Sequence, residues 1–224
     1  MKVSIVIPTY NEAANIEATL RGLQQWRQQG HEIIVVDGGS DDGTVALASP
    51  HADMAFVGPK GRARQMNTGA SKASGDIILF LHADTQLPNH AVNIVCNGLE
   101  QTGRNWGRFD VRLSGSHWLL RIVEMLMNIR SRFSGIATGD QAIFVRRSLF
   151  QQLKGYAEIP LMEDIELSRR LKRISRPYCI SQALTTSSRR WERRGIARTI
   201  LLMWRLRLAY FLGVSPERLA RQYL

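Results

Sequence analysis

Apolar and helix-like segments alternate along the first half of the chain. Four apolar runs have the length of strands: 2–7, 32–36, 54–57 and 76–81. Residues 77–81 are apolar at every position, which is typical of a strand buried on both faces of a sheet. Helical spacing follows three of the runs, over 13–28, from residue 42 or 44, and over 62–73. Strands separated by single helices predict right-handed crossovers and a mostly parallel sheet, in an α/β fold.

Individual residues predict where the first strand ends and how the first helix begins. Pro8 follows the first run and is expected to end that strand, and Asn11 or Asn15 is available as a cap for the helix after it. The second half is less regular. Residues 106–113 alternate like an edge or antiparallel strand, 141–145 resemble a strand, and 119–133, 163–174 and 198–212 are helical. With no repeat or linker, one domain over 1–224 is expected.

Composition restricts the class of protein. The chain of 224 residues is 44% hydrophobic and 22% charged, as in a soluble globular protein. It has no apolar run of 18 residues, so we expect no transmembrane helix, and its start lacks the long apolar stretch of a signal peptide. Cys96 and Cys179 are the two cysteines and have no metal-like spacing. We therefore expect a cytoplasmic protein in a reducing compartment.

Positive charge is concentrated at the C-terminal end. The chain has a net charge of +11, of which residues 1–168 carry −1 and residues 169–224 carry +12. Glu192 and Glu217 are the two acidic residues in the second of these segments. Such a segment attracts phosphates, nucleic acid or an anionic membrane surface. The apolar helix at 198–212 can pack on the domain, form a homodimer seam, or lie peripherally at the inner face of the membrane with Arg205 and Arg207 reaching lipid phosphates. Packing and dimerisation are the slightly favoured alternatives.

Polar side chains follow three successive predicted strands, at 8–12, 37–44 and 82–84. If the strands are parallel, these clusters meet at one edge of the sheet, where α/β proteins bind ligands. Asp37 can accept hydrogen bonds from a base or ribose, and Gly38 lets the backbone approach a ligand closely. Asp84 suits a hard divalent cation, and His82 is acceptable for Mn²⁺. Ordinary turns explain each cluster alone equally well.

Two helix starts carry charges. Arg62 and Arg64 begin the helix at 62–73, where positive charge opposes the helix dipole, so binding phosphate is a reason for their presence. Glu163 and Asp164 begin the helix at 163–174. They can cap that helix, or one can orient while the other accepts a proton as general base.

Taken in order, these motifs resemble family 2 glycosyltransferases, which are inverting nucleotide-sugar enzymes of the GT-A fold. The resemblance is carried by SIVIPTYNE, VVDGGSDDGT, GRARQMNTGASKASGDIILFLHADT and the pair Glu163–Asp164, and it spans most of residues 1–175. The phrases GRFDVRL, SGIATGDQAIFVRR, IPLMEDIELSRRL and SSRRWERRG resemble more narrowly a bacterial subgroup named for association with arsenosugar biosynthesis. That label rests on gene neighbourhood.

The resemblance implies a role for each motif. Residues 1–113 would bind the nucleotide sugar, with UDP the commonest donor nucleotide, 114–185 would form the acceptor and catalytic half, and 186–224 the basic loop and helices. Asp164 would be the general base beside Glu163, and Asp84 would hold Mg²⁺ or Mn²⁺ with His82. The implied donor-binding residues are Pro8, Tyr10, Glu12, Asp37, Gly38, Arg62, Arg64, Asn67, Ala83, Arg190 and Trp191.

In one respect the chain departs from the family pattern. The metal motif is usually Asp-x-Asp, and His82 stands at its first position, which leaves the metal preference open. The run Arg189-Arg190-Trp191, with Arg193 and Arg194, resembles the arginine–tryptophan motif of processive relatives, which closes over donor and acceptor, and a solvated basic loop is the alternative. Asp140 is a candidate for shaping the acceptor pocket. A lipid-linked acceptor would give the apolar C-terminal helix a purpose.

Two other functions fit parts of the sequence. A nucleotidyltransferase uses a similar sheet, but commonly has a Gly-rich basic signature after its first strand, where this chain has PTYNE. A non-catalytic nucleic-acid-binding protein would use the basic tail, but the acidic strand ends would repel a phosphate backbone. We therefore expect no nucleic acid as partner.

Overall fold

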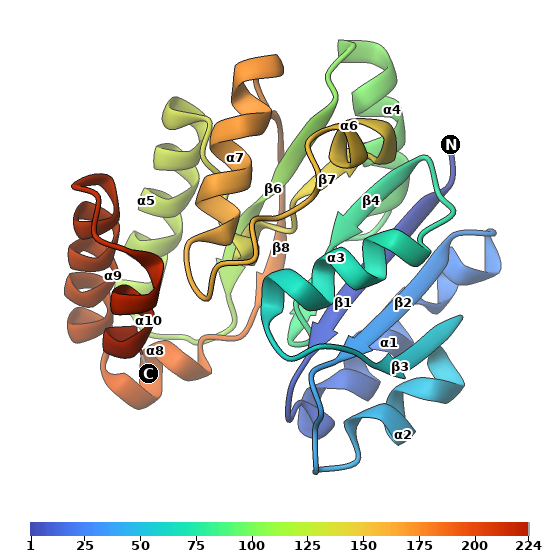
Figure 1. Cartoon of the computed structure of the whole chain (residues 1–224), viewed down its shortest axis with the longest axis horizontal. Coiled ribbons are helices and arrows are strands. Elements are labelled where there is room, and N and C mark those ends of the chain that lie inside the picture. The colour runs from blue at the N-terminus through green and yellow to red at the C-terminus, as the bar shows by residue number, and fades with distance from the viewer. Residues whose placement is uncertain (224) are drawn as a thin grey trace.

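The computed structural model describes residues 1–223, and over these the strands form one sheet in the order β3-β2-β1-β4-β7-β6-β8-β5 (Figure 1). The strands are β1 (Val3–Thr9), β2 (Glu32–Asp37), β3 (Met54–Val57), β4 (Ile77–Phe80), β5 (Thr85–Gln86), β6 (Trp106–Leu113), β7 (Phe144–Arg146) and β8 (Tyr178–Thr186). The helices are α1 (Ala13–Gln28), α2 (Thr44–Ala48), α3 (Arg62–Lys72), α4 (Ala91–Thr102), α5 (Trp118–Ser134), α6 (Arg147–Gln152), α7 (Glu163–Ile174), α8 (Arg189–Arg194), α9 (Ile196–Phe211) and α10 (Pro216–Tyr223).

The first half of the sheet is parallel, as the sequence predicts. Ile5 of β1 is paired with Ile33 of β2 on one side and with Leu79 of β4 on the other. β7 then runs antiparallel between β4 and β6, and β8 lies parallel to β6. Because β1, β2 and β4 run in one direction, the polar segments that follow them emerge at the same edge.

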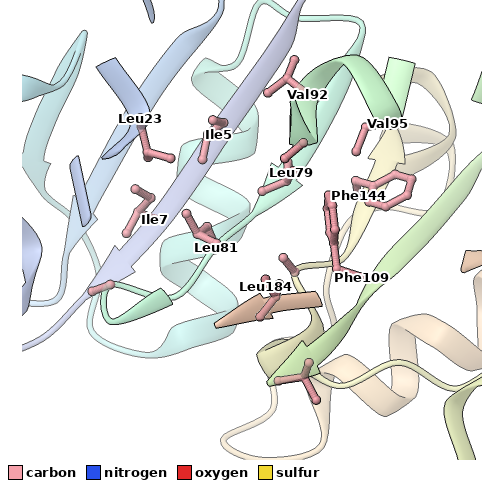
Figure 2. Packing of buried hydrophobic residues seen from close by; sticks show 14 of the residues in the cluster. Ile5, Ile7, Leu23, Leu79, Leu81, Val92, Val95, Phe109, Phe144 and Leu184 are labelled. Carbon is pink, nitrogen blue, oxygen red and sulfur yellow. The ribbon is translucent and has the colours of Figure 1, made fainter. Parts of the chain in front are cut away.

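Alternation along the strands divides the core into two layers. Ile5, Ile7 and Leu79 pack with residues of α1, α4 and α5 on one face of the sheet, as Figure 2 shows in part. Val6 and Phe80 point the other way and pack with α3, α6 and α7. Every residue from 77 to 81 is buried, which confirms a strand covered on both faces.

Two local predictions were wrong. β1 continues through Pro8, because β4 pairs only with Val3–Val6 and the missing N–H costs no ladder bond on that side. The start of α1 is not capped by Asn11 or Asn15. Instead the Asp42 carboxylate accepts a hydrogen bond from the Ala13 N–H at 3.0 Å.

The alternation at 106–113 predicted an edge or antiparallel strand. β6 does pair antiparallel with β7, although it lies inside the sheet between β7 and β8. Arg108 is fully buried and pairs with Asp110, which also accepts a hydrogen bond from Arg132 of α5 at 2.6 Å. These two charged side chains of β6 therefore have partners within the protein, whereas Arg112 is exposed.

After β8 the chain forms α8, α9 and α10, which pack beside α5 and the start of α7 (Figure 1). Leu206 of α9 and Leu219 of α10 are buried against Ile165 and Leu161 at the start of α7. This confirms that α9 packs on the domain through its inner face. Within residues 1–223, no helix is long and apolar enough to cross a membrane.

Candidate active site

A pocket of about 240 Å³ lies at the carboxyl ends of β1 and β4, beside the first turn of α3. We call it the rim pocket, and it is lined by Pro8, Thr9, Tyr10, Glu12, Arg62, Gln65, His82, Ala83 and Asp84. Open α/β sheets bind ligands in the crevice beyond the carboxyl ends of their strands, where the loops that follow neighbouring strands lie side by side. The structure thus brings together most of the residues that the sequence assigned to donor and metal binding.

Tyr10 forms an aromatic wall of the rim pocket. Its side chain is 46% exposed, and the Lys60 ammonium lies 4.0 Å from the ring centroid and donates a hydrogen bond to the phenol oxygen at 2.9 Å. An exposed ring with a cation beside it can stack on a nucleobase while attracting the phosphates attached to it.

Asp37 is completely buried, which the sequence did not reveal. Its Oδ1 accepts hydrogen bonds from the hydroxyls of Thr9 at 2.9 Å and Ser40 at 2.5 Å, and its Oδ2 accepts from the N–H groups of Gly39 and Ser40. A Cβ at Gly38 would lie 3.2 Å from the Gln65 side chain. Asp37 therefore closes the loop after β2, and a nucleotide would have to exchange one of these bonds to contact it.

Arg62 links the rim pocket to the acidic start of α7. Its Nε donates a hydrogen bond to the Glu163 Oε1 at 2.5 Å, and its Nη2 lies 4.0 Å from the Asp164 Oδ2. Burial opposes the charge, but the attraction of Glu163 and Asp164 outweighs it and raises the pKa of Arg62. Glu163 is 2% exposed and does not line the rim pocket, so it holds Arg62 from the buried side.

Asp164 and His82 meet at the loop that contains Gly139. The Asp164 Oδ2 accepts a hydrogen bond from the Gly139 N–H at 2.8 Å, and its Oδ1 accepts one from the Ile165 N–H at 2.7 Å. The His82 Nδ1 lies 3.4 Å from the Asp140 Oδ1, and its Nε2 lies 3.4 Å from the Arg62 Nη1. His82 therefore lies between Arg62, which lines the rim pocket, and Asp140 in the second half of the chain.

Asp84 is the candidate ligand for a divalent cation. It lines the rim pocket and makes no hydrogen bond or ion pair with any described residue. Over residues 1–223, no three His, Cys, Asp or Glu side chains gather closely enough to hold a metal by themselves. One free carboxylate in a pocket fits Mg²⁺ or Mn²⁺, which are commonly bound by one or two carboxylates together with substrate phosphates and water.

Comparison with known proteins now identifies the family. Residues 4–153 match the family model described as Glycosyl transferase family 2. The chain belongs to this family. A probable glycosyltransferase from Bacillus subtilis, YdaM, is 28% identical over 236 residues, which cover 95% of this chain and 55% of the relative. An undecaprenyl-phosphate 4-deoxy-4-formamido-L-arabinose transferase from Pseudomonas syringae pv. syringae is 31% identical over 156 residues, 64% of this chain and 46% of the relative. The chain thus spans about half the length of these relatives.

Solved structures show the same fold. S. aureus TarS 1–349 matches with a TM-score of 0.70 and 18% identity, over 84% of this chain and 61% of that one. A mannosyltransferase from Pyrobaculum calidifontis, solved with GDP-Man and Mn²⁺, matches with a TM-score of 0.64 and 20% identity, over 99% and 68% of the two chains. These neighbours confirm the predicted GT-A fold.

Six of the predicted donor-binding residues do not line the rim pocket of this family 2 chain: Asp37, Gly38, Arg64, Asn67, Arg190 and Trp191. Arg64 is exposed and forms an ion pair with Glu158 at 3.1 Å. Asn67 exchanges two hydrogen bonds with the backbone of Tyr156 and so fixes the segment before α7. Arg190 stacks on the Tyr223 ring, and Trp191 packs against the core beside α5.

Sequence reasoning missed Gln65, and within the arginine–tryptophan motif it assigned Arg190 to donor binding instead of Arg189. Gln65 ties the strand ends together, because its Nε2 donates hydrogen bonds to the carbonyl oxygens of Thr9 at 2.7 Å and Val36 at 2.9 Å. Arg189, rather than its neighbour Arg190, reaches the pocket, with its Nη2 3.5 Å from the Glu12 Oε2. Both lie in motifs that the sequence singled out, but a one-residue choice within a motif depends on side-chain direction.

Proposed function

We propose that the chain is a metal-dependent, inverting glycosyltransferase that moves a sugar from a nucleoside-diphosphate donor to an acceptor hydroxyl. The observation that carries this proposal is the connection between the rim pocket and Asp164. Arg62 and His82 line the rim pocket, and both also line a small inner cavity with Glu163 and Asp164. A donor diphosphate in the rim pocket would therefore have its sugar beside a carboxylate.

A UDP-sugar is the proposed donor. S. aureus TarS 1–349 has been solved with UDP-GlcNAc and with UDP, and the Pyrobaculum neighbour with GDP-Man. Tyr10 offers a ring for the base, and Arg62 and Arg189 bring positive charge for phosphate oxygens. The Asp37 contact to the nucleotide, and those of Arg64, Asn67, Arg190 and Trp191, stay predictions.

Asp164 is the proposed general base. It would take the proton from the acceptor hydroxyl while the hydroxyl oxygen bonds to the anomeric carbon and the bond from that carbon to the diphosphate oxygen breaks. Attack from the face opposite the leaving group inverts the anomeric centre. The N–H groups of Gly139 and Ile165 hold the Asp164 carboxylate in one orientation, and Glu163 keeps Arg62 beside it.

Asp84 is the residue that would hold Mg²⁺ or Mn²⁺, and the ion would neutralise charge that develops on the leaving diphosphate. His82 is the proposed second protein ligand. Its two ring nitrogens face Asp140 and Arg62, so binding a cation requires the ring to give up one of these neighbours. For that reason Asp84 is the stronger assignment.

The acceptor side is proposed to lie beyond Asp164. A pocket of about 70 Å³ is lined there by Asp140, Asp164, Met203 and Arg207, and it separates the catalytic carboxylate from α9. The narrower resemblance to the arsenosugar-associated subgroup adds no acceptor to the proposal, because that label rests on gene neighbourhood. A lipid-linked acceptor and a cytoplasmic location stay predictions.

The test is release of nucleoside diphosphate from a panel of UDP- and GDP-sugars with added Mn²⁺, which includes slow hydrolysis and so needs no acceptor. We expect one donor to be consumed and Asp164→Asn to abolish transfer. Glu158→Gln is the matched control, since Glu158 is an exposed carboxylate on the segment before α7. Turnover by Asp164→Asn equal to that of the wild type would refute the assignment of the base, and no release from any donor would refute the activity.

A further inference from the structure

The outer face of α5 is apolar, although it is not part of the core. Trp118 and Phe133, at its two ends, are 64% and 88% exposed. Between them, exposed apolar side chains recur at spacings of three and four residues: Ile122, Met125, Leu126 and Ile129. At 3.6 residues per turn these positions form one continuous stripe along the helix. The inner face of α5 packs on the sheet separately, through Leu120, Val123 and Met127.

A second apolar stripe runs along α9. Leu201, Trp204, Leu208 and Phe211 are each at least 60% exposed, and Leu212 directly follows the helix. α9 lies beside α5 (Figure 1), and the two helices contact each other. Of sixteen large hydrophobic side chains exposed among residues 1–223, eleven belong to these two stripes. Apolar side chains gathered on one face mark an interaction surface, whereas scattered ones need no explanation. We call this face the α5–α9 face.

Arginines flank the apolar stripes. Arg198 and Arg205 are seven residues apart on α9 and follow one edge of its stripe, while Arg207 follows the other edge. α9 contains no acidic residue. An apolar stripe bordered by arginines matches a bilayer surface, where apolar side chains enter the acyl boundary and guanidinium groups meet lipid phosphates.

Between the two stripes lies a groove of about 300 Å³ whose lining includes Leu126, Trp204, Arg130 and Arg207. The Nε and Nη2 atoms of Arg130 are buried and have no hydrogen-bond partner among the described residues. Burial, and then the neighbouring Arg207, lower the pKa of Arg130 to about 10, so its side chain is still charged at neutral pH. Asp140 also lines the groove, and its charge and that of Asp164 favour the charged form of Arg130, but neither carboxylate accepts a hydrogen bond from these two atoms. Buried donors without an acceptor are costly, and a phosphate oxygen would supply one.

We propose that the α5–α9 face docks on the surface of an anionic phospholipid bilayer, with Arg130 and Arg207 directed at lipid phosphates. A second copy of the chain is a poorer occupant, because two such faces would bring Arg198, Arg205 and Arg207 together with no acid on α9 to pair with them. The helices lie in the interface instead of crossing it, since no described helix can span a membrane. The proposal does not depend on the identity of the sugar donor.

Vesicle flotation tests the proposal without any sugar substrate, so its failure would leave the proposed reaction untouched. We expect the protein to float with phosphatidylcholine vesicles that contain phosphatidylglycerol and to remain below with phosphatidylcholine alone. Phe133→Ser combined with Leu208→Ser is expected to weaken binding by roughly tenfold for each large apolar side chain removed from the bilayer boundary. Val57→Ser is the matched control, because Val57 is 64% exposed on β3, away from this face.

A charge variant distinguishes docking on anionic lipid from non-specific hydrophobic adsorption to vesicles. Arg198→Gln combined with Arg205→Gln is expected to weaken binding to phosphatidylglycerol vesicles by about fivefold for each arginine, and Arg130→Gln to lower it further. Absence of flotation by the folded wild type would overturn the proposal, and so would equal binding by the Phe133→Ser/Leu208→Ser variant. A solution dimer that this variant dissociates, with no vesicle binding, would assign the face to a second copy.

Discussion

Two ion pairs at the start of α3 allow the contribution of a buried carboxylate to the stability of the fold to be tested. Arg62 pairs with Glu163, and Arg64, two residues later, pairs with Glu158. Both glutamates are far from α3 in sequence. The Glu163 side chain is 2% exposed, whereas the Glu158 side chain is 57% exposed. Arg62→Ala should therefore destabilise the fold far more than Arg64→Ala.

The magnitudes follow from burial. Removing one partner of a buried pair costs about 3–5 kcal/mol, because the other charge is left without a partner. The Arg62 side chain is 39% exposed, so water screens the pair and we expect about 2–3 kcal/mol for Arg62→Ala. In a chain of this size that lowers the Tm by about 4–12 °C. Arg64→Ala should cost about 0–1 kcal/mol, or at most about 4 °C.

Thermal unfolding followed by circular dichroism measures both variants. The double variant Arg62→Ala/Glu163→Gln serves as the rescue, because it removes the buried charge that the single variant strands, and it should recover much of the lost Tm. Equal and small shifts for Arg62→Ala and Arg64→Ala, or no recovery in the double variant, would refute the view that Glu163 is a buried carboxylate held by Arg62.

Three further predictions address catalysis, donor binding and pH. Asp164→Asn should lower kcat by about 10²–10⁴ with little change in the donor KM, measured as nucleoside diphosphate release. An unchanged kcat would contradict the assignment. Tyr10→Ala should raise the donor KM by roughly tenfold through loss of stacking, while Leu47→Ala, another exposed apolar residue, should not. Burial, then the N-terminal amino group and Lys2, lower the pKa of His31, whose Nδ1 accepts a hydrogen bond from the Val3 N–H. The unfolded chain thus binds the proton more readily, and the free energy of unfolding should fall as pH drops below about 6.5 and level off below the folded pKa. Urea titrations should show that slope in the wild type and a flatter one in His31→Gln.

The local pattern predicted many elements of this chain, although it gave no expectation for α4 or β8. The run at 76–81 and the start of α7 at Glu163 follow directly from hydrophobic spacing and charge. What the pattern did not contain was the pairing of distant strands. The order β4-β7-β6-β8 depends on contacts between segments that no local period describes, so the pattern could offer an edge or an antiparallel position for β6 but could not place it between β7 and β8.

The sequence predicted residue types that line the rim pocket, but it did not predict the directions in which individual side chains point. Asp37 lies in the expected cluster, yet all its hydrogen bonds are to its own loop and to Thr9. The spacing of Arg189 and Arg190 could not tell which of them turns toward Glu12. The outward apolar face of α5 was equally hidden, because a helix with apolar residues on two faces gives no sign of which one the sheet will cover.

The central claim is that the rim pocket binds a nucleoside diphosphate through a divalent cation held by Asp84. The most direct measurement is thermal unfolding of the wild type and Asp84→Ala with UDP or GDP, with and without Mn²⁺. At about 100-fold excess over Kd, a nucleotide should stabilise the wild type by about 2.7 kcal/mol, and only when Mn²⁺ is present. Asp84→Ala should lose that gain, whereas Asp41→Ala, an exposed acid at the same edge, should keep it. Equal stabilisation of Asp84→Ala, or stabilisation of the wild type without metal, would contradict the claim.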